Sequence, residues 1–192
     1  NMVLGSTAFG GGGRAELVSI ESAWLEGGGG NNTILTQAFD GPVTLHGGEG
    51  NDTLYGTVYE DALYGDGGND LLNGRDGEDY LDGGDGIDRL FGGAFDDTFA
   101  GGAGDVVRGQ GGDNLLVFEA DDDVTATAST VSFSGGSLNH LDIDVIHLVG
   151  GESNNTCLLY ASGAADGRSR VGLGGRRSRK TRGGGETNME LR

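Results

Sequence analysis

The feature that most constrains this chain is a nine-residue period in which every copy begins with glycine. From residue 47 the sequence divides into "GGEGNDTLY", "GTVYEDALY", "GDGGNDLLN", "GRDGEDYLD", "GGDGIDRLF", "GGAFDDTFA", "GGAGDVVR" and "GQGGDNLLV", with one residue deleted in the seventh copy. A short, regular internal period of this kind indicates a solenoid, in which each repeat contacts only its neighbours. The eighth position is always apolar: Leu54, Leu63, Leu72, Leu81, Leu90, Phe99, Val107 and Leu116.

Each copy reads as a turn followed by a very short strand. Glycine accounts for 42 of the 192 residues. The first six residues of each copy are rich in glycine and do not suit the interior of a strand, whereas the last three, around one apolar side chain, can form a short strand. Because successive turns reverse the chain, equivalent residues should recur every eighteen residues, at the ~4.7–4.9 Å spacing of paired strands. We therefore expect an all-β fold, a parallel β-roll (β-solenoid) with the eighth-position side chains inside and short β-strand flanks.

The sixth position is acidic in all but the last copy, which has Asn114. Stacking would place its carboxylates in two ladders, where neighbours ~5 Å apart repel by about 3 kcal/mol at an effective dielectric of ~20. A cation between the rungs removes this repulsion, and Ca²⁺ prefers six to eight oxygens at ~2.3–2.6 Å. The ladders are Asp52, Asp70, Asp88 and Asp105 on one edge, and Asp61, Asp79 and Asp97 on the other.

Glycine in the turns would let backbone carbonyls complete the shell of such an ion. The sequence therefore predicts calcium as the cofactor. The glycines expected at these sites are Gly47, Gly48, Gly50, Gly65, Gly68, Gly83, Gly84 and Gly86.

These residues resemble the RTX (repeats-in-toxin) family of calcium-binding repeats. The resemblance covers residues 47–117, and "GGGGNNTIL" at residues 27–35 is a further single copy. It implies a β-roll that binds calcium and folds when a secreted, bacterial protein leaves the low-calcium cytosol through a type I channel. The C-terminal residues do not resemble the secretion signals of that family.

The two edges differ in the fourth position of the turn. On the first edge this position is always glycine, as in Gly50, Gly68 and Gly86, whereas the second edge has Tyr59 and Phe95 there. A bulky residue should block the backbone geometry that glycine permits. We therefore expect tighter ion binding on the first edge, with Asp52/Asp70 and Asp70/Asp88 as the best pairs.

Two interpretations without calcium remain open. An acidic, glycine-rich tract could be a solvated linker, although a linker has no reason to keep an apolar residue at every eighth position. Asp and Asn are also common turn formers, which could explain Asn32 and Asn114 without a metal.

Charge and composition divide the chain further. Residues 1–166 carry 28 Asp and Glu against 4 Lys and Arg, while residues 167–192 carry 2 against 8. The acidic body should repel nucleic acid, and no apolar run approaches the length of a membrane span. We expect a β-rich N-terminal flank with one isolated repeat (1–46), the roll (47–118), a β-rich C-terminal flank (119–166) and a disordered basic tail (167–192).

A longer self-similarity links "IESAWLEGGGGNNTIL" at residues 20–35 with "IDVIHLVGGESNNTCL" at residues 143–158. The C-terminal flank therefore reads as the start of a second unit, and further repeat units of a longer parent protein are expected partners. The chain has neither H-E-x-x-H nor G-x-S-x-G, so we expect no intrinsic enzyme activity. The alternatives are a non-catalytic fragment of an extracellular protease, lipase or sugar epimerase, and a calcium-stiffened adhesin.

Overall fold

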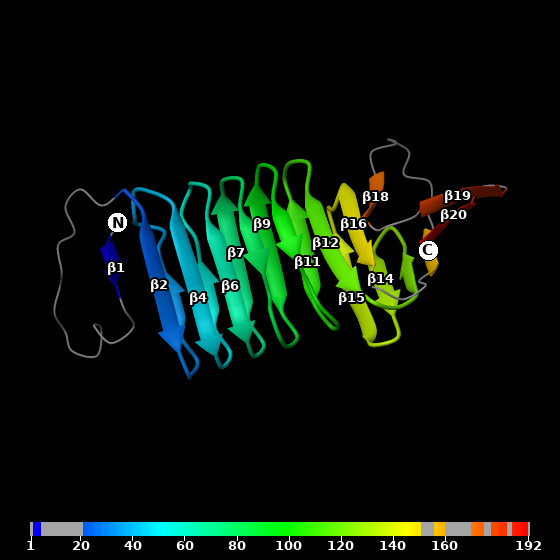
Figure 1. Ribbon diagram of the computed structural model, residues 1–192. Helices are drawn as coiled ribbons and strands as arrows, with labels where there is room; N and C mark the ends of the chain where they lie inside the picture. The colour runs from blue at the N-terminus through cyan, green and yellow to red at the C-terminus, as the bar shows by residue number, and fades with distance from the viewer. Residues whose placement is uncertain are drawn as a thin grey trace.

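The computed structural model describes the backbone of residues 2–4, 21–150, 156–159, 170–174, 178–183 and 186–191. The fold is a parallel β-roll in which the chain alternates between two sheets (Figure 1). Sheet A contains, in spatial order, β1 (Met2–Leu4), β2 (Ala23–Gly28), β4 (Val43–Glu49), β6 (Ala62–Gly67), β8 (Tyr80–Asp82), β10 (Thr98–Ala100), β12 (Leu115–Ala120), β16 (Val145–Gly150) and β18 (Arg170–Gly174).

Sheet B forms the other wall of the roll. In spatial order it contains β19 (Ser178–Gly183), β20 (Glu186–Leu191), β17 (Thr156–Leu159), β13 (Val124–Ala126), β14 (Thr130–Phe133), β15 (Gly136–Leu141), β11 (Val106–Gln110), β9 (Arg89–Ala94), β7 (Leu71–Asp76), β5 (Thr53–Tyr55) and β3 (Thr33–Leu35). The described part of the chain contains no helix that could cross a membrane.

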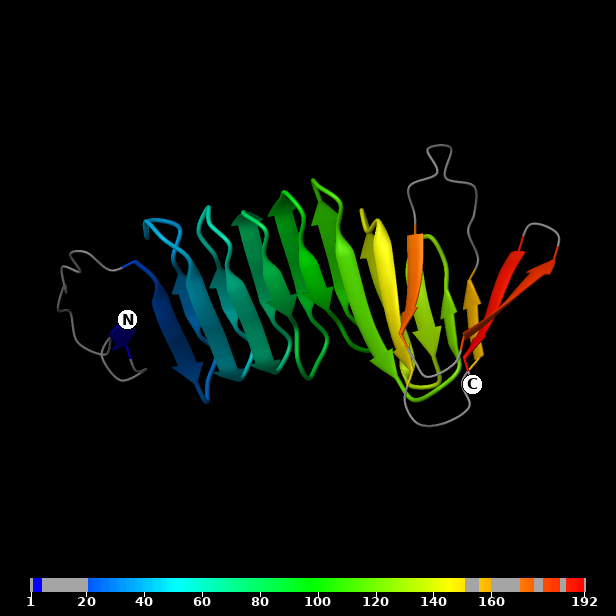
Figure 2. The same cartoon turned by 45° about the horizontal axis from the view of Figure 1, so that its top comes forward.

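The register of the strands creates the core. On sheet A, Leu63 pairs with Leu81 and Leu81 with Phe99, and on sheet B, Leu54 pairs with Leu72 and Leu72 with Leu90. The eighth-position side chains of all eight copies are fully buried, which confirms that they point inward. Together they form one hydrophobic cluster between the two sheets. The strands of the two sheets are stacked along the axis of the roll (Figure 2).

The copy at residues 27–35 is not set apart from the array. β2 pairs in parallel with β4, and β3 pairs in parallel with β5, so that Ile34 lies in register with Leu54. The spacing between these two residues is twenty rather than eighteen, and the two additional residues fall in the connection between β3 and β4. This copy is therefore a rung that is continuous with the roll instead of the isolated repeat expected from the sequence.

The C-terminal flank extends the same roll after an insertion. β13, β14 and β15 form an antiparallel meander, and β15 then joins β11 in parallel while β16 joins β12. Within the tail expected to be disordered, the structure describes strands β18, β19 and β20. β18 pairs with the open edge of β16, because backbone hydrogen bonds of a sheet edge do not depend on the composition of the partner.

Candidate metal centre

The sixth-position side chains lie inside the turns, one above the other. Turns that lead from sheet A to sheet B, here called the A-to-B edge, carry Asp52, Asp70, Asp88 and Asp105, and turns that lead back, the B-to-A edge, carry Asp61, Asp79, Asp97 and Asn114. None of these side chains is more than 4% exposed. Each ladder expected from the sequence is therefore present, and its members are buried.

One oxygen of each carboxylate is held by the backbone of the preceding rung. Oδ1 of Asp70 accepts a hydrogen bond of 2.7 Å from the N–H of Asp52, and Oδ1 of Asp88 accepts one of 2.8 Å from the N–H of Asp70. The same contact joins Asp79 to the N–H of Asp61 at 2.8 Å and Asp97 to that of Asp79 at 3.0 Å. These bonds fix one oxygen of each of these carboxylates in the same way.

The other oxygen is left without a partner in five of the carboxylates. Oδ2 is buried and accepts no hydrogen bond in Asp52, Asp70, Asp79, Asp88 and Asp97. Burial of polar groups without hydrogen bonds is costly, and buried charges are normally paired or coordinate metals. A cation next to these five oxygens would compensate their buried charge. The residues present therefore fit a bound metal ion.

Electrostatics agree with this interpretation. Burial raises the pKa of Asp70 above its ordinary value, with the neighbouring carboxylate of Asp52 adding to the effect. Burial and neighbouring aspartates raise the pKa of Asp79, Asp88 and Asp97 to about 7. Without a cation, the folded chain thus disfavours the ionised form of the side chains that a hard cation requires.

Two of the predicted ligands are instead satisfied by the protein. The carboxylate of Asp61 accepts hydrogen bonds from the N–H of Val43 at 2.8 Å, the N–H of Thr57 at 2.5 Å and the Thr57 hydroxyl at 3.1 Å. Burial still raises the pKa of Asp61, and these hydrogen bonds oppose that rise. Asp105 accepts from the N–H of Asp88 at 2.8 Å and from that of Gly102 at 2.6 Å.

Asn114 closes the B-to-A ladder without a charge. Its Oδ1 accepts a hydrogen bond from the N–H of Asp97, and its amide nitrogen donates to the carbonyl oxygens of Gly111 and Asp142. The side chain therefore supplies its own donors in place of a cation, in agreement with its interpretation as a turn former.

The predicted glycines pack closely against these ladders. A Cβ at the first position of a turn, at Gly47, Gly65 or Gly83, would press on Oδ2 of the aspartate in the same turn. A Cβ at Gly68 or Gly86 would collide with the carbonyl oxygen of the glycine one rung earlier. Positive φ angles of 84° to 139° are found at Gly48, Gly50, Gly68, Gly84 and Gly86.

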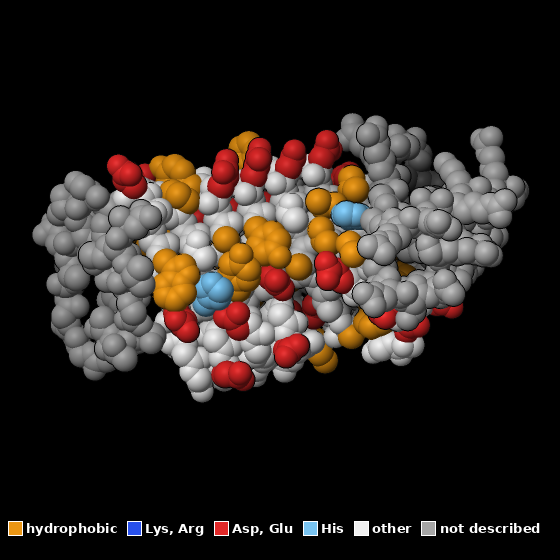
Figure 3. Space-filling view, in the orientation of Figure 1, with side chains coloured by type: hydrophobic (Ala, Val, Ile, Leu, Met, Phe, Trp, Pro, Cys, Tyr) orange, Lys and Arg blue, Asp and Glu red, His pale blue; other side chains and the backbone are white. Residues whose placement is uncertain are grey.

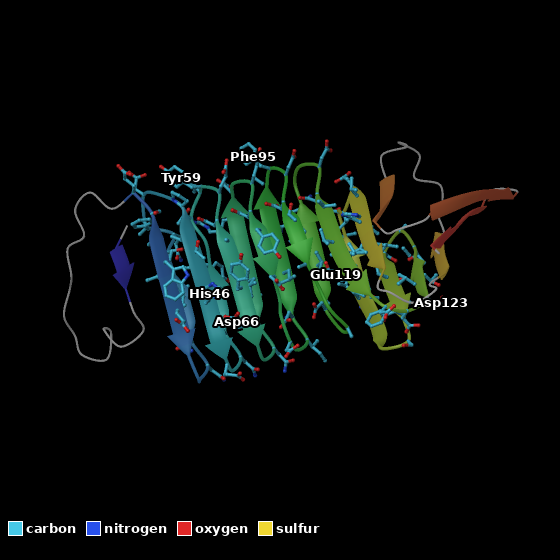
Figure 4. All side chains as sticks on the ribbon, in the orientation of Figure 1. His46, Tyr59, Asp66, Phe95, Glu119 and Asp123 are labelled. Atoms are coloured by element: carbon cyan, nitrogen blue, oxygen red, sulfur yellow. The ribbon has the colours of Figure 1, made fainter. Side chains whose placement is uncertain are left out.

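The B-to-A edge departs from the motif in one turn rather than throughout. Phe95 adopts a φ of 81° with its side chain 62% exposed, so the prediction that its bulk blocks the backbone is wrong. Tyr59 lacks a positive φ, and its N–H donates to the Thr57 hydroxyl at 3.1 Å. Both aromatic residues lie along the same edge in Figure 4. The sequence marks Thr57 as a departure from the motif at the second position of the turn, but it did not reveal that Thr57 donates to Asp61.

Carboxylates alone do not complete a site. Among residues 21–149, no group of three or more His, Cys, Asp or Glu side chains gathers closely enough to hold an ion. Backbone carbonyl oxygens of the glycine-rich turns would therefore have to provide the remaining ligands, a mixture of donors that suits Ca²⁺.

Comparison with protein-family models identifies the repeats. The model of the RTX calcium-binding nonapeptide repeat, which spans four copies, matches residues 23–38, 40–58, 46–81, 55–90, 82–105 and 91–124, which together make up more than half of the chain. Comparisons with curated proteins and with solved structures give no match. The matched segments contain both carboxylate ladders and all the turns described above. The chain belongs to the RTX family, whose nonapeptide repeats bind Ca²⁺.

Proposed function

We propose that calcium controls whether this chain folds. The observation that carries the proposal is the set of five buried carboxylate oxygens without hydrogen-bond partners, the Oδ2 atoms of Asp52, Asp70, Asp79, Asp88 and Asp97. Bound calcium would supply positive charge and accept oxygen ligands at these positions. Asp52, Asp70 and Asp88 would bind calcium on the A-to-B edge. Asp79 and Asp97 would bind it on the B-to-A edge.

Asp61 and Asp105 have a different role in this proposal. Their carboxylates hold their turns through protein donors, Thr57 and Val43 for Asp61, and Gly102 and Asp88 for Asp105. They therefore stabilise rungs without an ion. Glycines of the turns, including Gly48, Gly50, Gly68, Gly84 and Gly86, would provide carbonyl oxygens and the close backbone approach.

The energetics make the calcium-free fold unstable. A buried, unpaired charge costs several kcal/mol after relaxation, and each glycine in a regular element costs roughly 0.5–1 kcal/mol relative to alanine. Domains are stable by only about 5–15 kcal/mol, so a few such carboxylates exceed the margin. The chain would be unfolded where calcium is scarce and folded where it is abundant.

The same switch suits a protein that works outside the cell. RTX repeats typically occur in secreted proteins, and extracellular calcium modules have dissociation constants of about 10⁻⁴–10⁻³ M. We propose that the chain is exported unfolded, through a type I route, and folds on meeting external calcium. RTX repeats are structural calcium-binding repeats rather than catalytic ones, and we assign no catalytic role to this chain.

Calcium titration followed by circular dichroism tests the proposal. The full chain should convert from coil to β structure as calcium rises, and calorimetry should detect several bound ions. Magnesium should not replace calcium, because it requires near-octahedral geometry and loses its water reluctantly. A chain with the same β content in chelator and in calcium would refute the proposal.

A further inference from the structure

A groove of about 650 Å³ runs along the outer face of sheet A next to the B-to-A edge. It is lined by residues 22–24, 42–44, 60–62, 78–80, 96 and 98, so five successive rungs contribute the same positions of the repeat. The groove therefore extends parallel to the axis of the roll and presents a repeating surface. Such a shape suits a linear polymer better than a compact ligand.

Aromatic rings follow the same direction on this face. The ring centroids of Trp24 and His46 lie 5.6 Å apart, those of His46 and Tyr64 lie 4.5 Å apart and nearly parallel, and those of Tyr64 and Tyr80 lie 5.6 Å apart. All four side chains are partly exposed and point away from the leucine core. Figure 3 shows this row as a hydrophobic patch interrupted by a histidine, and Figure 4 labels His46 there.

Two of these rings, Trp24 and Tyr80, line the groove itself. Between them in the register of sheet A lie Thr44 and Ala62, whose small side chains leave the floor open. Three inter-strand spacings separate the two rings along the axis, a distance of about 14 Å at the usual strand spacing. The rings thus stand at two points along a shallow floor, each able to pack against a flat, partly apolar ligand ring.

The rim of the groove along the B-to-A edge is acidic. Glu60, Glu78 and Asp96 occupy the fifth position of successive turns and are exposed. No Lys or Arg is found among the described residues that line the groove. Carboxylates accept hydrogen bonds from hydroxyl groups and, more strongly, from ammonium groups, and they repel anionic polymers.

The position of the groove disfavours a peptide partner. Peptides commonly bind sheets by adding a strand to an open edge. The floor here is the face of sheet A, where β2, β4, β6 and β8 already pair with one another. Its backbone groups are used, so a ligand must offer its own flat faces and its own donors.

We propose that this groove binds a linear amino-sugar polysaccharide, with sugar rings packed on Trp24 and Tyr80 and ammonium and hydroxyl groups donating to Glu60, Glu78 and Asp96. The sugar provides both a partly apolar ring face for the floor and a dense set of donors for the acidic rim. Positive charge on its amino groups complements the acidic rim. Asp79, whose Oδ2 is one of the proposed calcium ligands, also lines the groove, so the site rests on the proposed function and requires the folded, calcium-bound roll.

The probe is a glucosamine hexasaccharide, titrated calorimetrically into the full chain with calcium present. One hexamer should bind per chain, and Trp24→Ala or Tyr80→Ala should weaken the affinity by about tenfold or more. Glu78→Gln should also weaken binding. Tyr55→Ala, which removes a partly exposed ring from the outer face of sheet B, is the matched control and should leave binding unchanged. Circular dichroism confirms that each variant is folded.

Comparison ligands decide among the alternatives. A hexamer of unmodified glucose should bind more weakly, and an oligomer of uronic acid should not bind. The proposal is overturned if the glucosamine hexamer does not bind the folded chain, if the glucose hexamer binds equally well, or if Tyr55→Ala weakens binding as much as Tyr80→Ala. Tighter binding of hexalysine at the same residues would overturn it in favour of a basic peptide.

Discussion

Thr57 donates both its backbone N–H and its hydroxyl to the carboxylate of Asp61, at 2.5 and 3.1 Å. This carboxylate occupies the same place in its turn as Asp79 one rung later, whose Oδ2 has no partner. A hydroxyl from the protein thus stands where a cation would otherwise compensate the charge. The neighbouring rungs of one ladder therefore differ in their need for an ion.

The Thr57–Asp61 contact predicts that an additional calcium site can be created. The double variant Thr57→Gly, Tyr59→Gly removes the hydroxyl that donates to Asp61. It also restores glycine at both positions of the turn that take positive φ elsewhere, so that the backbone can adopt the conformation of the other turns. Calorimetry should then detect one more bound ion per chain than in the original protein. An unchanged number of ions, with the roll folded, would show that Thr57 does not replace a cation.

The carboxylate ladders predict a ranking of single substitutions. Asp70→Ala and Asp79→Ala each remove an unpartnered Oδ2, so each should raise the calcium concentration at the folding midpoint by about tenfold. Asp61→Ala should shift this midpoint less, because it removes no calcium ligand and costs only the hydrogen bonds that its carboxylate accepts from Thr57 and Val43. Circular dichroism in a calcium titration gives all three midpoints. Equal midpoints for Asp79→Ala and Asp61→Ala would contradict the ranking.

The core predicts a loss of folding at any calcium concentration. Leu72 is fully buried and lies in register between Leu54 and Leu90, so Leu72→Asp would bury a charge that no neighbour can pair. The milder Leu72→Ala should destabilise the calcium-bound roll by about 2–5 kcal/mol in urea unfolding. Asn73→Asp, one residue away and directed outward, is the control. Full calcium-induced structure in Leu72→Asp would mean that this stack is not the core.

Two adjacent glycines allow a backbone test. Gly68 has a φ of 136°, and a Cβ there would collide with the carbonyl oxygen of Gly50. A Cβ at Gly67 would meet only the Glu49 side chain, with 3.4 Å to its Oε2. We therefore expect Gly68→Ala to raise the calcium midpoint strongly and Gly67→Ala to leave it almost unchanged. The measurement is a calcium titration of each variant, followed by circular dichroism. A higher calcium midpoint for Gly67→Ala than for Gly68→Ala would contradict the packing of the turns.

Acidification should favour the calcium-free fold. The pKa of Asp79, Asp88 and Asp97 is about 7 in the folded chain, above the ordinary value of 3.8. At pH values between these two pKa values, the folded state therefore binds more protons than the unfolded state. This stabilisation is fully present below the ordinary pKa and is lost as pH rises through about 7. In chelator, circular dichroism should show more β structure at about pH 5.5 than at about pH 8.

Calcium reverses this dependence, because protons compete with the ion for the same oxygens. The calcium concentration at the folding midpoint should therefore rise as the pH falls from about 8 to about 5.5. A calcium-free chain that loses β structure on acidification would show that the buried carboxylates do not govern its stability.

The periodicity of the sequence was sufficient to predict the roll. Because the side chains of a strand alternate and each copy has one apolar residue at a constant position, only a stack with Leu54, Leu72 and Leu90 in register buries them, and this register is confirmed. The same periodicity placed Asp52, Asp70 and Asp88 above one another. Local pattern and global fold agree here because each rung contacts only its neighbours.

The sequence by itself thus determined the β-roll, its leucine core and the two columns of aspartates, since these depend only on a period repeated along the chain. The tertiary structure alone decided which carboxylates lack a partner. Thr57 at Asp61 and the N–H of Gly102 at Asp105 satisfy those side chains through local turn conformations that the repeat pattern does not specify. Hydrogen bonds of this kind depend on distances and angles of a few tenths of an ångström and a few degrees, and those exist only once the rungs are stacked.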